Sequence, residues 1–73
     1  MTQTVTATYD DILKAINAFD ELVSEGIDRE KLFLDRETNQ LKVIVPEDVQ
    51  RQVESILERH EPEKVWAQPY QEQ

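Results

Sequence analysis

Few residues of this chain have the chemistry of a catalytic site. His60 is the only histidine, and its place near the end of an expected helix suits a favourable contact with the helix dipole. An acid–base or metal-binding role would need a second group, and none lies near it in the sequence. The serines, Ser24 and Ser55, fall in expected helices and form no set of nucleophile, base and orienting residue. The sequence therefore predicts a protein that is not an enzyme.

Asp10 and Asp11 are the best candidates for a pair of metal-binding carboxylates. They stand between an expected strand and an expected helix, where capping of free backbone N–H groups is the commoner role, and Asp10 is the expected cap. The chain has no cysteine, which excludes disulfides and thiolate metal sites. Its single glycine, Gly26, excludes a glycine-rich phosphate loop. We expect no cofactor and no metal.

Composition narrows the class of protein further. The chain has 73 residues, enough for a single domain over 1–73 with a thin core. Sixteen acidic residues against eight basic ones give a net charge of −8, which disfavours nucleic acid and anionic membranes as partners. No apolar run approaches the ~20 residues of a membrane helix. No signal-peptide pattern is present, so a cytoplasmic location is expected.

Periodicity predicts four strands and two helices. Alternation of threonine with other residues predicts a strand over 2–9, and short apolar runs predict strands over 32–34, 41–45 and 64–68. Apolar residues at spacings of three and four predict helices over about 10–25 and about 47–60. Gly26 suits the turn that ends the first helix, and the polar segment 35–40 suits a hairpin turn. We expect an ordered core of about 3–68 and a disordered tail over 69–73.

The order strand, helix, strand, strand, helix, strand is typical of the ferredoxin-like fold. This α+β βαββαβ plan has a four-stranded antiparallel sheet with both helices on one face. The strand residues expected on the helix-covered face are Val5, Ala7, Leu32, Leu34, Leu41, Val43, Val45, Val65 and Ala67. The helix residues expected to meet them are Ile12, Ile16, Phe19, Leu22, Val23, Val49, Val53, Ile56 and Leu57.

Strand alternation also predicts what the opposite face of the sheet carries. The residues expected there are Thr4, Thr6, Thr8, Phe33, Lys42, Ile44 and Trp66. An apolar patch on an open sheet face usually marks a contact. Three interpretations stay open: a dimer contact, a docking surface for a protein or small ligand, or a one-residue slip that puts these residues in the core. Aromatic residues on such a sheet also stack RNA bases, but we expect only Lys42 as a cation here.

Two segments resemble the small bacterial domains grouped around heat-induced general stress proteins. One is VTATYDDILKAINAFDELVSEGI, a strand, an aromatic-acidic step, a helix and a terminal Gly–Ile. The other is LKVIVPEDVQRQVESILERHEPEKV, a strand and a helix that ends before a valine-containing strand. The resemblance covers about two-thirds of the chain and implies a small regulatory or stress-related protein without a catalytic motif.

The resulting functional hypothesis is a non-enzymatic protein that acts by self-association or protein–protein interaction. The expected interaction surface is Phe33, Ile44, Trp66, Thr6 and Lys42. A homodimer is the first expectation, because a marginal core often gains from oligomerisation. A regulatory module that binds a small-molecule ligand is the alternative.

Overall fold

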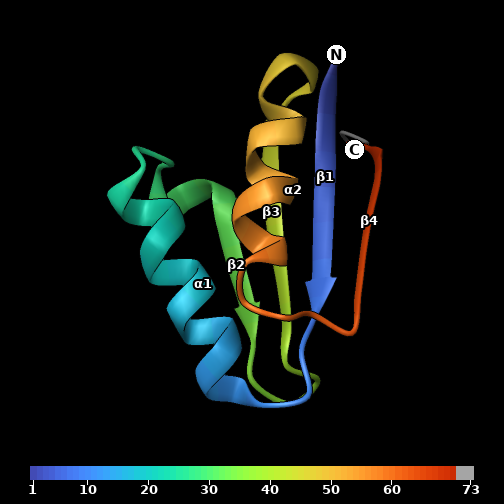
Figure 1. Ribbon diagram of the computed structural model, residues 1–73. Helices are drawn as coiled ribbons and strands as arrows, with labels where there is room; N and C mark the ends of the chain where they lie inside the picture. The colour runs from blue at the N-terminus through green and yellow to red at the C-terminus, as the bar shows by residue number, and fades with distance from the viewer. Residues whose placement is uncertain (71–73) are drawn as a thin grey trace.

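The computed structural model describes residues 1–70 and confirms the predicted α+β ferredoxin-like fold (Figure 1). Its elements are β1 (Thr2–Thr8), α1 (Ile12–Ser24), β2 (Leu32–Asp35), β3 (Gln40–Pro46), α2 (Gln50–Glu58) and β4 (Lys64–Pro69). Two 3₁₀ turns, η1 (Arg29–Lys31) and η2 (Glu47–Val49), precede β2 and α2. No helix in the described part of the chain is long and apolar enough to cross a membrane.

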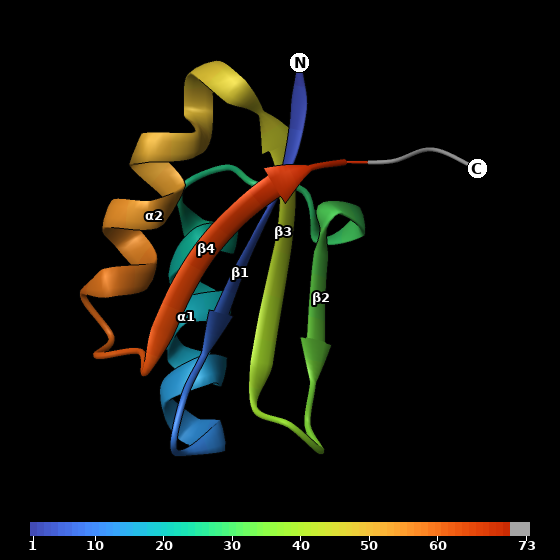
Figure 2. The same cartoon turned by 90° about the vertical axis from the view of Figure 1, so that its right-hand side faces the viewer.

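All four strands form one antiparallel sheet in the order β2-β3-β1-β4. β1 is therefore central, and β2 and β4 are the two edges. Both helices lie on the same side of this sheet, which leaves the other face uncovered (Figures 1 and 2). The four-residue turn between β2 and β3 is the predicted hairpin, and Asn39 adopts a positive φ of 56° in it.

The core lies between the sheet and the helices, as strand alternation predicts. From the strands, the core takes Val5, Ala7, Leu32, Leu41, Val43 and Val45. From the helices it takes Ala15, Ala18, Leu22, Val53, Ile56 and Leu57. Leu32 is 6% exposed and its neighbour Phe33 is 50% exposed. The one-residue slip that would bury Phe33 is thus excluded.

The side chains that α1 buries most deeply differ from those that the sequence predicts. Its most buried side chains are Ala15, Ala18 and Leu22. Ile12 and Phe19, which we expect in the core, are only partly buried at its margin. Small side chains at the centre let the helix approach the sheet closely, and the larger ones cover the sides of the contact.

The residue that caps the N-terminus of α1 differs from the predicted one. Asp11, and not Asp10, is the N-cap: its Oδ1 accepts a hydrogen bond from the Leu13 N–H at 2.9 Å. Asp10 instead forms an ion pair with Lys14, with 3.2 Å between Oδ1 and Nζ. The helix therefore begins at Ile12, two residues after the predicted start.

Gly26 ends α1 in the way that its position predicts. Its φ is 100°, a backbone conformation that residues with a Cβ rarely adopt. The Gly26 N–H donates to the Val23 carbonyl, and the Ile27 N–H donates to the Leu22 carbonyl. This pair of bonds is a Schellman motif, and the partly buried Ile27 supplies the hydrophobic contact that accompanies it.

Tyr9 joins the end of β1 to α2. Its side chain is 2% exposed, and its hydroxyl donates to the Leu57 carbonyl at 2.9 Å. The hydrogen bond satisfies a phenol that would otherwise be buried without a partner. Burial also raises the pKa of Tyr9 well above its ordinary value. The contact fixes α2 over the central strand.

The C-terminal part of the sheet extends beyond the predicted strand. β4 continues through Pro69, and the Tyr70 N–H donates to the Thr2 carbonyl at 2.9 Å. The expectation that the tail begins at 69 is therefore wrong for Pro69 and Tyr70, because both continue the pairing with β1. The rest of the expected tail, 71–73, lies outside the described residues.

Candidate interaction surface

Four of the five predicted surface residues form one row across the uncovered face of the sheet. Phe33 on β2 pairs with Lys42 on β3, Lys42 pairs with Thr6 on β1, and Thr6 pairs with Trp66 on β4. Ile44 lies one step further along β3, beside Thr4. We call this uncovered side of the sheet the open face. Residues far apart in the sequence thus meet in one small area.

The open face is apolar at its margins and partly solvent-exposed. Phe33, on the β2 edge, is half-exposed and Lys42 is exposed, whereas Ile44 and Trp66 are partly buried. The side chains of Ile44 and Trp66 have no helix over them, so their partial burial comes from neighbours on the same face. The open face is therefore an accessible surface with both apolar and charged side chains.

Thr6 is buried, although the threonine pattern predicts a residue on an open surface. It is 1% exposed, and its Oγ1 has no hydrogen-bond partner among the described residues. Its neighbours on the adjacent strands are Lys42 and Trp66, whose long side chains stand on either side of it. A buried hydroxyl without a partner costs roughly 1–3 kcal/mol. Alternation predicts the face of a residue and leaves open how far larger neighbours cover it.

The charge of the open face differs from that of the whole chain. Its strand positions carry two lysines, Lys42 and Lys64, and one aspartate, Asp35, which is a net charge of +1 against −8 for the chain. The expectation that Lys42 is the only cation of this face is wrong. Lys64 also lies on it, with its Nζ 5.9 Å from the centre of the Trp66 ring.

The carboxylate of Asp35 forms a hydrogen bond within the β2–β3 hairpin. Its Oδ1 accepts a hydrogen bond from the Glu37 N–H at 2.9 Å. This bond, with smaller contributions that include the charge of Lys42, lowers the pKa of Asp35 below its ordinary range. Neither Lys42 nor Lys64 has a carboxylate within 4 Å in the part of the chain that the structure describes.

A shallow groove of about 460 Å³ crosses the open face. The residues that line it are Thr4, Phe33, Lys42, Ile44, Gln68, Pro69 and Tyr70. A second hollow of about 540 Å³ shares Phe33, Ile44 and Tyr70 with the groove, so the two are continuous. Tyr70 is not among the predicted surface residues, because the sequence places it in the expected tail over 69–73. Continued alternation from Trp66 through Gln68 would have placed it on this face.

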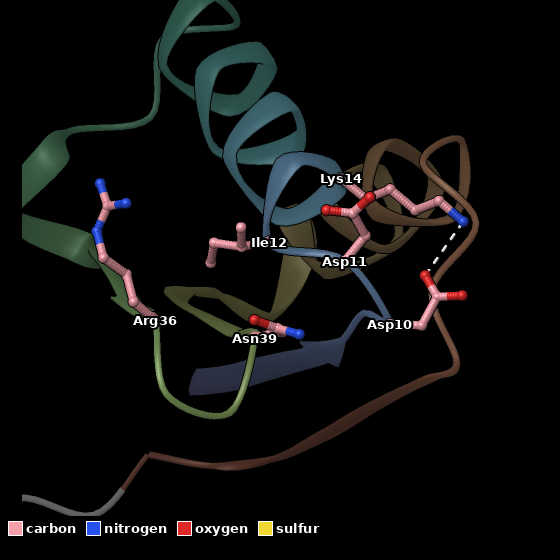
Figure 3. A pocket seen from close by; sticks show the side chains of 6 residues that line it. All are labelled: Asp10, Asp11, Ile12, Lys14, Arg36 and Asn39. Atoms are coloured by element: carbon pink, nitrogen blue, oxygen red, sulfur yellow. Dashed lines mark ion pairs between the residues drawn. The ribbon is translucent and has the colours of Figure 1, made fainter.

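Asp10 and Asp11, the candidate metal-binding carboxylates, line a different hollow, of about 590 Å³ (Figure 3). Asp10 is paired with Lys14, and Asp11 caps α1. Arg36 lies on the hairpin across the hollow from them (Figure 3). No group of three histidine or acidic side chains that could hold a metal ion occurs among residues 1–70. Capping and ion pairing therefore account for the positions of the two aspartates.

His60 belongs to a contact between the two helices. Its Nε2 lies 2.7 Å from Oε1 of Glu21 on α1, and Arg59 pairs with the other oxygen of that carboxylate. The Ser24 hydroxyl donates to the Glu21 carbonyl at 2.8 Å. Sequence reasoning missed Glu21, because its partners are nearly forty residues away along the chain. The arrangement joins α1 to the end of α2.

No family model, curated protein or solved structure matches the chain. The resemblance to stress-protein domains therefore stays a prediction.

Proposed function

We propose that the protein is a non-enzymatic interaction module that binds another protein through its open face. The observation that carries the proposal is the row Phe33–Lys42–Thr6–Trp66 on the side of the sheet that no helix covers. It combines exposed apolar surface with a lysine that has no carboxylate within 4 Å among residues 1–70. Apolar surface gathered in this way favours a contact with a partner. The proposal includes a cytoplasmic location and, from the resemblance, a regulatory or stress-related role.

Site-specific photo-crosslinking tests this proposal. A photoreactive phenylalanine analogue replaces Phe33 in one variant and Leu13 in the other, and both variants are irradiated in the producing cells. Leu13 is the matched control because it is also a large apolar side chain, 62% exposed, on α1. We expect discrete adducts from position 33 and none from position 13. Equal labelling at the two positions, or no adduct at position 33, would contradict the proposal.

Self-association is the second candidate function, and the free edge of β4 favours it. The Tyr70 N–H donates to Thr2 on β1, and backbone groups along an antiparallel strand point alternately toward and away from its neighbour. The backbone groups of Trp66 and Gln68 therefore point toward β1, and those of Val65 and Ala67 point away from it. An uncovered strand edge can pair with the same edge of a second copy. The result would be a homodimer with one continuous sheet.

Sedimentation at micromolar concentration tests the dimer and locates it. An edge-to-edge dimer dissociates when Ala67→Pro removes an outward N–H, and it survives Phe33→Ser. A dimer held by the open face shows the reverse pattern. A wild-type protein that sediments as a monomer would rule out the second candidate and leave the first intact.

A further inference from the structure

The charge of the open face indicates what kind of partner fits it. Lys42 and Lys64 project from this face without a carboxylate within 4 Å among residues 1–70, and Asp35, the aspartate at a strand position of this face, is bonded within its own hairpin. The remaining surface of the chain is strongly acidic. A carboxylate on a partner would therefore find a favourable site beside these lysines, because the rest of the chain carries a net negative charge.

The groove beside Lys42 provides the apolar part of the site. Phe33, Ile44 and Tyr70 line both the groove and the hollow that continues it, so a large apolar side chain can contact all three. Phe33 and Tyr70 are also two of the most exposed large apolar residues of the protein. Lys42 lines the same groove, so an apolar side chain and a carboxylate close to it in one segment can be bound together.

The size of the face argues against a second copy as its occupant. Four strands spaced ~4.8 Å apart and roughly 20 Å long give a face of about 400 Å². A stable interface needs about 800 Å² on each partner. A second copy would also bring its own Lys42 and Lys64 toward those of the first, which is electrostatically unfavourable. A short segment of a partner chain needs less area and brings no such charge.

We propose that the open face binds an extended peptide segment in which one or two carboxylates lie next to an aromatic or large aliphatic side chain. The carboxylate pairs with Lys42, and the apolar side chain occupies the groove between Phe33, Ile44 and Tyr70. Because the rest of the protein is acidic, a segment with a long run of carboxylates is repelled, and only locally placed negative charge is accepted. This inference rests on the proposed function and names its ligand.

Selection of peptides from a random phage-displayed library on the immobilised protein tests the inference. We expect the selected sequences to be enriched in aspartate or glutamate within two residues of an aromatic or large aliphatic residue. A selected peptide is then synthesised and titrated against the wild-type protein, Lys42→Gln and Arg51→Gln. Arg51→Gln is the matched control, because it removes the same charge from the exposed outer side of α2.

We expect Lys42→Gln to weaken binding roughly tenfold and Arg51→Gln to leave it within about twofold, because only Lys42 forms a charge-assisted bond with the peptide. Changes in the amide chemical shifts of the protein on addition of a peptide locate its binding site. Selected peptides that bind the open face but lack carboxylates would overturn this inference and leave the proposed function standing. Peptides that map to the helices would overturn both. A library that yields no binder would also overturn the inference.

Discussion

At the scale of single residues, two buried hydroxyls differ in their hydrogen bonding: that of Thr6 in β1 and that of Tyr9 just after it. The Tyr9 hydroxyl donates to the Leu57 carbonyl, whereas Thr6 Oγ1 has no partner among the described residues. The first stabilises the contact between β1 and α2. The second costs free energy in the folded state, since the hydroxyl loses its bonds with water on folding.

Replacing Thr6 with valine should raise the free energy of unfolding by about 1 kcal/mol, because the isosteric side chain removes the unpartnered hydroxyl. Urea denaturation at neutral pH measures the change. Thr8→Val is the control on the same face of β1, at a position that is only partly buried. A Thr6→Val protein that is less stable than the wild type would show that the hydroxyl makes a favourable bond.

Replacing Tyr9 with phenylalanine should lower the free energy of unfolding by about 1 kcal/mol at neutral pH, because the bond to Leu57 is lost. The difference in the free energy of unfolding between the wild type and Tyr9→Phe should depend on pH. The folded protein holds the phenol proton more tightly than the unfolded chain, in which the pKa is 10.0. Above that pH the unfolded chain loses a proton that the folded protein keeps, so stability falls as pH rises.

The wild-type protein should therefore lose stability between pH 9 and about 11 more steeply than Tyr9→Phe. Urea denaturation at several pH values over this range measures both slopes. Tyr70→Phe, which removes an exposed phenol, is the matched control. Equal slopes for the wild type and Tyr9→Phe would show that the Tyr9 hydroxyl is accessible to solvent in the folded state.

At the scale of elements, the two helices are joined at one end by Glu21, Arg59 and His60. Glu21 and His60 are both mostly buried side chains, which favours their interaction over that of fully solvated charges. The exposed pair Asp10–Lys14, by contrast, lies within one helical turn and is more fully solvated. The first contact fixes one helix against the other, whereas Asp10 and Lys14 are neighbours at the start of α1, where Lys14 also pairs with Glu61 at 3.5 Å.

A double-mutant cycle on Glu21→Gln and His60→Gln should give a coupling free energy of roughly 0.5–1 kcal/mol. The same cycle on Asp10→Asn and Lys14→Gln should give a smaller value, because that pair is more exposed. Thermal or urea denaturation of the wild type, the four single variants and the two double variants measures both. A coupling at Glu21 and His60 no larger than that at the exposed pair would exclude a special role in helix docking.

The elements of this fold were predictable where the signal is local. Alternation assigns the faces of Val5, Phe33 and Lys42 correctly, because a strand has a fixed period of two. Gly26 marks the end of α1 because few other residues adopt its φ. The burial of Thr6 and the pairing of Glu21 with His60 were not predictable, because each depends on a neighbour from a distant part of the chain.

At the scale of the whole molecule, the excess of negative charge opposes compaction. The chain carries −8, and the described ion pairs are few and mostly exposed. Repulsion between like charges is stronger in the folded protein than in the expanded unfolded chain, so it lowers stability.

Salt should therefore stabilise the protein. Raising sodium chloride from 20 to about 300 mM should increase the free energy of unfolding by roughly 1 kcal/mol, or the Tm by ~4–8 °C, because it screens the repulsion. Thermal denaturation followed by circular dichroism measures the shift. A Tm that falls over this range would mean that the ion pairs outweigh the net repulsion.

The central position of β1 has a consequence for how the protein is made. β1 is synthesised before the other three strands, yet one of its two neighbours is β4, and residues 2 and 70 meet in the finished sheet. Until the ribosome has released residues 64–70, the nascent chain holds β1 with one side unpaired, so cooperative folding waits for the end of translation of this segment. During that interval β1 is a strand edge that chaperones can bind and that other nascent chains can capture.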